Sequence, residues 1–164
     1  MKIGVTGAPG SGKTELAKMI AEKFGLPFIT VDIDMIAEKR RIDVLRASAE
    51  RTLARELQYA IFLAQADEED RHESFVADKT AIDCLAYFVL YDLNGETGRI
   101  YKEKCLSRPY DLLVYVPCCR EEFRELDGII AGILRSVPAP VVEVSGPPEG
   151  ALKTIERELK KRWT

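Results

Sequence analysis

The stretch Gly7-Ala8-Pro9-Gly10-Ser11-Gly12-Lys13-Thr14 decides the fold. It matches the pattern G-x-x-x-x-G-K-[ST] without a gap, and the apolar residues 2–6 before it are typical of a buried parallel strand. From Glu15 to Phe24 the apolar residues lie three or four apart, which predicts a helix that ends at Gly25. A strand, this loop and a helix in succession predict a phosphate-binding loop.

Each residue type in the loop has a physical reason. Glycines let the backbone curl so that N–H groups point at phosphate oxygens, and the N-terminus of the next helix adds positive charge. Lys13 supplies a point charge for the β- and γ-phosphates, and the Thr14 hydroxyl is a ligand for Mg²⁺. We therefore predict ATP and Mg²⁺ as cofactors. The expected nucleotide contacts are Gly7, Ala8, Pro9, Gly10, Ser11, Gly12, Lys13 and Thr14.

The rest of the chain alternates short apolar runs with amphipathic segments. Strands are predicted at residues 2–6, 27–31, 73–78, 111–116 and 141–144, and helices at 15–24, 42–66, 81–93 and 149–162, with a turn at Asn94-Gly95. Strands that alternate with helices indicate βαβ units and a three-layer α/β/α sandwich around a five-stranded parallel sheet. The length of 164 residues predicts one domain, 1–164, without a linker or a repeat.

Composition indicates a soluble, cytoplasmic protein. Hydrophobic residues make up 46% of the chain and charged residues 31%, and no apolar run approaches the ~20 residues that span a bilayer, so no membrane partner is predicted. The N-terminus enters the first strand directly, which predicts no signal peptide. The four cysteines lack any metal-binding spacing and are expected to be reduced thiols. The net charge of −3 disfavours a surface devoted to polyanions.

Three aspartates follow the predicted strands, at the edge of the sheet where ligands bind in open α/β folds. Asp78 ends the third strand as a candidate metal ligand, and Asp32 or Asp34, after the second, would accept the proton of an attacking hydroxyl. If that strand continues, Asp32 and Asp34 share one face of the sheet. The alternative for each is a helix cap. Asp83 is predicted to be structural, because Thr80-Ala81-Ile82-Asp83 has the form of a capping box.

Two further segments carry a resemblance to a family. Together with the loop, Phe75-Val76-Ala77-Asp78-Lys79-Thr80-Ala81-Ile82-Asp83-Cys84-Leu85-Ala86-Tyr87 and Tyr110-Asp111-Leu112-Leu113-Val114-Tyr115-Val116 resemble the nicotinamide-riboside-kinase-like P-loop kinases, which are close in design to deoxynucleoside kinases. The resemblance implies the strand order 2-3-1-4-5, with acids of the third and second strands serving metal and base. It also implies an arginine-bearing lid after the fourth strand and an adenine loop at Ser145-Gly146-Pro147.

The chain departs from the pattern of this family in two places. Lys79 stands where the family usually has Arg, which keeps the charge and loses the bidentate geometry. The space for a lid is short, from Cys118 to Gly128. Within it, Arg120 and Arg124 lie four residues apart, so that they either face the transferring phosphoryl group together or pair with neighbouring glutamates on a solvated helix.

These observations predict an ATP- and Mg²⁺-dependent kinase that phosphorylates a hydroxyl of a nucleoside-like small molecule, with catalysis by Lys13, Asp34 or Asp32, Asp78, and Arg120 or Arg124. Two alternatives stay open. In the first alternative, the acceptor is nucleic acid, either a polynucleotide end or a hydroxymethylated base in DNA, held through the basic run Lys39-Arg40-Arg41. In the second alternative, the chain is a regulatory ATP-binding NTPase without an acceptor. Gln58 and Gln65 on the long helix are candidates to read a nucleobase, and the oligomeric state is left open.

Overall fold

The sheet has the predicted order. The computed structural model describes residues 1–91 and 95–163, and within them five parallel strands form one sheet in the order β2-β3-β1-β4-β5. The strands are β1 Lys2–Thr6, β2 Phe28–Ile29, β3 Phe75–Asp78, β4 Leu112–Tyr115 and β5 Val141–Glu143. Both the α/β class and the strand order implied by the resemblance are therefore confirmed.

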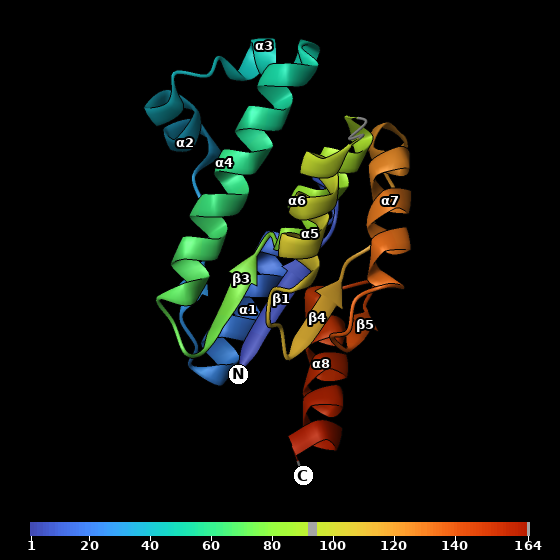
Figure 1. Ribbon diagram of the computed structural model, residues 1–164. Coiled ribbons are helices and arrows are strands. Elements are labelled where there is room, and N and C mark those ends of the chain that lie inside the picture. The colour runs from blue at the N-terminus through green and yellow to red at the C-terminus, as the bar shows by residue number, and fades with distance from the viewer. Residues whose placement is uncertain (92–94, 164) are drawn as a thin grey trace.

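Helices cover both faces of the sheet (Figure 1). They are α1 Lys13–Phe24, α2 Ile33–Arg40, α3 Val44–Ala49, α4 Arg51–Asp70, α5 Ala81–Leu90, α6 Glu96–Leu106, the 3₁₀ turn η1 Glu121–Phe123, α7 Arg124–Leu134 and α8 Pro148–Trp163. Strand β4 illustrates the division of the core. Its residues Leu112 and Val114 pack with α1 and α8, whereas Leu113 and Tyr115 pack with the helices on the opposite face. No helix of the described residues combines the length and apolarity needed to cross a bilayer.

The long helix predicted at residues 42–66 is interrupted. Glu50 has an extended backbone, with φ −111° and ψ 111°, and separates α3 from α4. The Asp43 carboxylate starts α3 by accepting the N–H groups of Leu45 and Arg46. Because the apolar spacing continues across Glu50, periodicity alone predicts one helix where the chain forms two. No sequence-based prediction covers α6, and the predicted helix to residue 93 ends at Leu90 as α5.

The second strand is shorter than predicted, which moves two candidate site residues. Strand β2 ends at Ile29, so Asp32 and Asp34 do not share a strand face. Asp32 is the N-cap of α2, and its carboxylate accepts the N–H of Met35 at 3.0 Å. This local hydrogen bond favours a helix start over a longer strand. The predicted turn at Asn94-Gly95 includes Asn94, which lies outside the described residues.

Candidate functional site

The phosphate-binding loop joins β1 to α1, as predicted. Gly12 at its end has a left-handed backbone, with φ 87°, which a residue without a side chain adopts readily. Helix α1 has no side-chain cap, a feature that it shares with α4, α6 and α7, whereas α2, α3 and α5 are capped by Asp32, Asp43 and Thr80. The first N–H groups of α1 are thus left without a side-chain acceptor, which suits an anionic ligand.

The candidate metal ligands Thr14 and Asp78 meet beside this loop. Strand β3 pairs with β1 so that Asp78 lies next to Val5, and the Thr14 hydroxyl donates a hydrogen bond to Oδ2 of Asp78 at 2.8 Å. The other oxygen, Oδ1, is buried and has no hydrogen-bond partner in the structure. A hydroxyl and a carboxylate are oxygen ligands of the kind that Mg²⁺ prefers. The unpartnered oxygen of Asp78 therefore fits a bound divalent cation.

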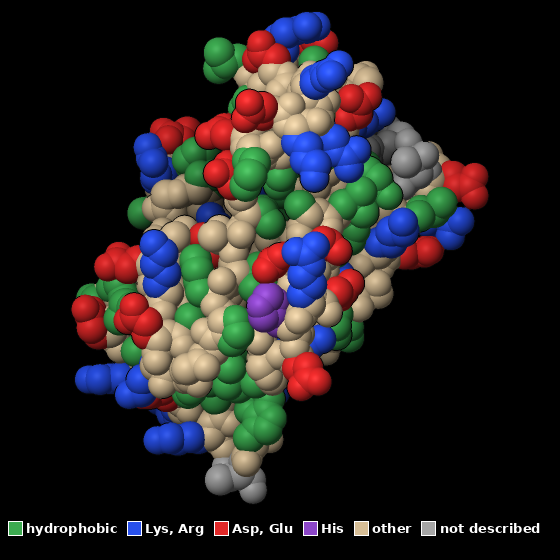
Figure 2. Space-filling view, turned by 90° about the vertical axis from the view of Figure 1, so that its left-hand side faces the viewer, with side chains coloured by type: hydrophobic (Ala, Val, Ile, Leu, Met, Phe, Trp, Pro, Cys, Tyr) green, Lys and Arg blue, Asp and Glu red, His purple; other side chains and the backbone are tan. Residues whose placement is uncertain are grey.

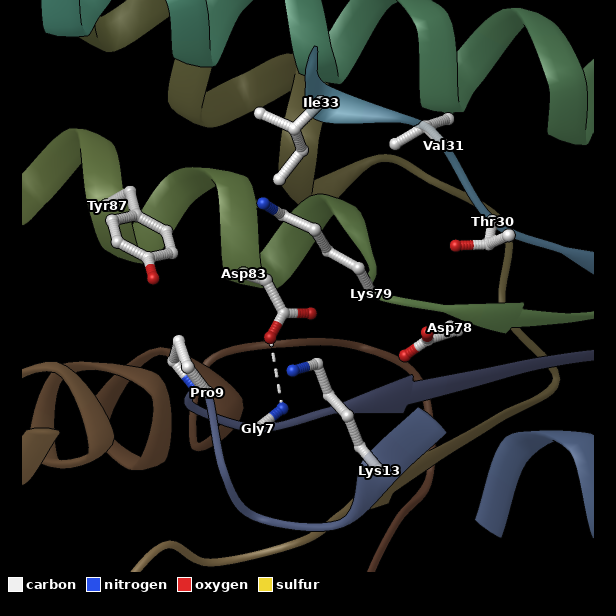
Figure 3. Close-up of a pocket in the computed structure, with 10 residues that line it drawn as sticks. All are labelled: Gly7, Pro9, Lys13, Thr30, Val31, Ile33, Asp78, Lys79, Asp83 and Tyr87. Atoms are coloured by element: carbon white, nitrogen blue, oxygen red, sulfur yellow. Dashed lines mark hydrogen bonds between the residues drawn. The ribbon is translucent and has the colours of Figure 1, made fainter. Parts of the chain in front are cut away.

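A pocket of about 210 Å³ opens above the loop. Figure 3 shows the side chains of Lys13 and Lys79 at this pocket, with the carboxylates of Asp78 and Asp83 between them. Tyr87 closes one side. Burial and the nearby Asp83 carboxylate raise the pKa of Tyr87 to about 12, so its hydroxyl remains protonated at neutral pH. The pocket thus offers two cations and a hydroxyl donor to an anionic group.

Lys79 has an unusual backbone for its position. Its φ is 72°, in the left-handed region that a residue with a side chain rarely adopts. The residue follows β3 directly, its N–H donates to the carbonyl oxygen of Val5, and its ammonium nitrogen lies 5.2 Å from the ring centroid of Tyr87. Strain of this kind costs about 1–3 kcal/mol and clusters at functional sites. It turns the Lys79 side chain toward the pocket (Figure 3).

A second cavity, of about 170 Å³, shares Ile33, Lys79 and Tyr87 with the first. Apolar side chains of α3 and α4 line most of it, among them Ala47, Ala54, Leu57 and Ile61. Gln58 is one of the polar residues in this wall, together with Ser48 and Lys79. It is 8% exposed, and its Oε1 is buried and finds no hydrogen-bond partner among the described residues. This second cavity has the form of a binding site for a flat apolar group that carries an N–H donor.

The third cavity, of about 530 Å³, lies on the other side of the loop. Its wall includes Ser145 and Gly146 of the predicted adenine loop, with Pro148 in place of Pro147. Among the lining residues that the sequence did not predict for this site are Cys118 and Cys119, which follow β4. The Cys118 thiol donates to the carbonyl oxygen of Pro9, and its N–H donates to Asp127 on α7.

Neither candidate base lines the pockets. The residues that reach them from this segment are Thr30, Val31 and Ile33, whereas the side chains of Asp32 and Asp34 are exposed. Asp32 is engaged as the helix cap described above. No hydrogen bond or ion pair of Asp34 is found among the described residues. The condition for both acids to share one face, a strand that continues through them, is not met, because β2 ends at Ile29.

The two candidate lid arginines lie in different places. Arg120 lies over the loop, because a Cβ built on Gly10 would come within 2.8 Å of its Cδ atom. It forms an ion pair with Glu122 at 2.7 Å. Arg124 begins α7, is 76% exposed and pairs with Glu121. The turn η1 between the two arginines breaks the helical spacing that would have placed them side by side. Only Arg120 is near the phosphate loop.

The remaining residues singled out in the sequence lie in different parts of the structure. Asp83 forms the predicted capping box with Thr80 and, unforeseen, also accepts the N–H of Gly7 at 3.0 Å. Gln65 is buried and donates to Glu69 at 2.9 Å, so it serves the packing of α4 and does not line the cavity beside Gln58. The basic residues Lys39, Arg40 and Arg41 are exposed at the end of α2.

The sequence also matches a known family. Residues 2–129 fit the pattern of a family described as the AAA domain, which is more than three quarters of the chain. The chain belongs to the AAA domain family. No curated protein sequence matches it.

Solved structures with the same fold include kinases and NadR proteins. Deoxyadenosine kinase from M. mycoides with dCMP and dCDP bound superposes with a TM-score of 0.73 at 13% identity, over 98% of this chain and all of that chain. NadR in complex with NR gives 0.69 at 20% identity, over 87% of this chain and 42% of that chain. Thymidylate kinase from Ehrlichia chaffeensis superposes with a TM-score of 0.67 at 14% identity, over 97% of this chain and 98% of that chain. The predicted resemblance to nucleoside-kinase-like P-loop proteins is thus confirmed for the fold.

Proposed function

We propose that this protein is an ATP-dependent kinase that transfers the γ-phosphoryl group to a hydroxyl of a small, nucleoside-like acceptor. One observation carries the proposal. The pocket over the phosphate loop and the apolar cavity beside Gln58 share Ile33, Lys79 and Tyr87 in their walls. A donor phosphate and an acceptor would therefore meet at a single point, as in-line phosphoryl transfer requires.

The donor side is assigned to the phosphate loop. Its N–H groups and Lys13 hold the β- and γ-phosphates, and the cavity lined by Ser145 and Gly146 takes the adenosine. Thr14 and Asp78 are the residues that would hold Mg²⁺. When bound, that ion neutralises charge on the phosphate oxygens. Lys79 and Arg120 are the proposed cations that face the transferring group, Lys79 from the pocket wall and Arg120 from above Gly10.

The acceptor side is assigned to the cavity between α3, α4 and α5. Its apolar walls suit a nucleobase, and the side-chain amide of Gln58 pairs well with an edge that presents an N–H donor next to an acceptor. Asp34 is the proposed proton acceptor, because it adjoins Ile33 and has no protein partner among the described residues. Catalytic hydrogen bonds often tighten only when substrate binds, so an exposed Asp34 is compatible with this role.

Surface charge favours a small acceptor over nucleic acid. On the face seen in Figure 2, Lys and Arg side chains lie among Asp and Glu side chains. Arg46, near the basic run, pairs with Glu50 at 2.9 Å. A polynucleotide site needs a continuous basic track along the backbone of the nucleic acid. Nucleic acid therefore remains the second candidate, carried by Lys39, Arg40 and Arg41 alone.

A product screen tests the proposal. The protein is incubated with ATP and MgCl₂ together with each nucleoside, nucleoside monophosphate, single strand or duplex, and the phosphorylated product is identified by mass spectrometry. We expect a monophosphorylated product from at least one nucleoside-like compound. Consumption of ATP at the same rate with and without every acceptor would contradict the proposal and favour a regulatory NTPase.

The Gln58→Leu variant locates the acceptor. It removes the amide and keeps a side chain of similar size, so KM for the acceptor should rise at least tenfold, about 1.4 kcal/mol, while the Kd for ATP stays unchanged. Leu63→Gln, on the exposed side of the same helix, is the control and should change neither value. An unchanged acceptor KM in Gln58→Leu would place the acceptor elsewhere.

A further inference from the structure

The carboxylate of Asp83 makes two separate connections. Its Oδ2 atom accepts hydrogen bonds from the N–H and the hydroxyl of Thr80, at 2.7 and 2.9 Å. Its Oδ1 atom accepts the N–H of Gly7 at 3.0 Å, across 76 positions of sequence. Asp83 is only 2% exposed, so these bonds are shielded from water.

Capping of α5 accounts for only one of these connections. A capping box needs one carboxylate oxygen, and Oδ2 already fills that role. The Thr80 hydroxyl also accepts the N–H of Ile82, which supplies the helix N-terminus with a side-chain acceptor. The bond from Oδ1 to Gly7 therefore adds nothing to the cap. It joins the start of α5 to the first residue of the phosphate loop, as the dashed line in Figure 3 shows.

The hydrogen bonds of Asp83 also connect the loop to the residue before Thr80, which is Lys79 in the pocket wall. Thr80, which Asp83 holds, directly follows Lys79, and Lys79 lines the same pocket as Lys13. The loop is also held on its far side, where the Cys118 thiol donates to the carbonyl oxygen of Pro9. Gly7 and Pro9 are thus both held by side chains from other elements, whereas the N–H of Ser11 is bonded within the loop, to the carbonyl oxygen of Ala8.

We infer that Asp83 is a positioning residue that holds the phosphate loop open for nucleotide by fixing Gly7, and that it sets the spacing between the loop and Lys79. The inference rests on the proposed function only in that the loop binds a nucleotide. It assigns to a capping residue a second role, in ATP affinity, that capping alone would not produce.

Two variants separate the two roles. Asp83→Asn keeps the shape of the side chain, but its NH₂ group should face Gly7, because the Oδ2 position accepts two donors from Thr80 and the Oδ1 position accepts one from Gly7. Thr80→Val keeps the shape of Thr80 and removes its hydroxyl, so the cap is weakened while the bond between Asp83 and Gly7 stays. Both variants are expected to lower the melting temperature.

The test measures ATP binding without an acceptor, by calorimetry, and exchange of the Gly7 amide proton, by NMR. We expect Asp83→Asn to bind ATP about tenfold more weakly, or about 1.4 kcal/mol, and to exchange the Gly7 amide faster, while Thr80→Val matches the wild type in both. Equal ATP affinity in Asp83→Asn and wild type, or equal losses in the two variants, would overturn the inference.

The wild-type protein provides a readout that needs no variant to fold. Without nucleotide, its Gly7 amide proton should exchange more slowly than that of Gly10, which is exposed on the same loop. Equally fast exchange at both residues would also overturn the inference. Failure of the wild type to bind ATP would instead contradict the proposed function, because protection of Gly7 is measured independently of ATP.

Discussion

The hydroxyl of Thr14 and the carboxylate of Asp78 are joined by a hydrogen bond of 2.8 Å, although the two residues lie 64 positions apart in the chain. The bond unites the start of α1 with the end of β3. It leaves Oδ1 of Asp78 buried and without a partner. A buried acceptor without a partner costs about 1–3 kcal/mol, and a divalent cation or its water shell would remove that cost.

Asp78→Asn should therefore lower the affinity for Mg²⁺. The amide keeps the shape and loses the charge, so the MgCl₂ concentration for half-maximal activity should rise at least tenfold. Asp111→Asn is the control, because Asp111 also adjoins a strand of the sheet, β4, but accepts the N–H of Lys2 and not a hydroxyl of the phosphate loop. An unchanged Mg²⁺ response in Asp78→Asn would remove this residue from the metal site.

The proposed base is tested by comparing two neighbouring aspartates. Asp34→Asn should lower kcat by about 10²–10⁴-fold with ATP affinity unchanged, because general bases contribute factors of this size. Asp32→Asn is the control, since asparagine caps a helix as well as aspartate does and only the charge is lost. A large loss of kcat in Asp32→Asn, with Asp34→Asn still active, would make Asp32 the proton acceptor in place of Asp34.

The cysteines report where the nucleotide binds. Cys119 is exposed in the cavity assigned to adenosine, whereas Cys84 is fully buried, and burial raises the pKa of its thiol to about 12. Thiolates are the reactive form, so at pH 8 iodoacetamide should label Cys119 and leave Cys84 unlabelled until the protein is unfolded. ATP should slow labelling of Cys119, measured by peptide mass spectrometry. Labelling of Cys119 at the same rate with saturating ATP would place the nucleotide elsewhere.

The nature of the acceptor is tested through salt. A polynucleotide releases counterions when it binds, so its log affinity falls by roughly 0.7–0.9 per unit of log salt for each phosphate contact. Replacing Lys39, Arg40 and Arg41 with Gln should leave KM for a small nucleoside nearly unchanged. A steep salt dependence on DNA or RNA that disappears in this triple variant would instead favour the nucleic acid alternative.

Local patterns predicted the parts of the site that depend on contiguous residues. The phosphate loop is one uninterrupted motif, and Asp78 was found because the carboxyl ends of parallel strands meet at one edge of the sheet. The capping box at Thr80 and Asp83 is likewise a short-range pattern.

Other parts of the site depend on competition between distant or weak interactions. Asp32 was expected at a strand end, but its bond to Met35 starts a helix there. The cavity beside Gln58 is lined by residues of both α3 and α4, which separate at Glu50, and apolar spacing does not reveal that break. The bond between Asp83 and Gly7 joins residues 76 positions apart in the sequence, and no local spacing pattern indicates it.

Transfer of a labelled γ-phosphate from ATP tests the central claim most directly. The wild type and Lys13→Ala are compared with the acceptor that the product screen identifies, after circular dichroism has established that both are folded. We expect label in the acceptor with the wild type and a rate lower by about 10²–10³-fold in Lys13→Ala, because Lys13 stabilises charge on the phosphates. Label that stays in inorganic phosphate, or transfer that is undiminished without Lys13, would contradict the account.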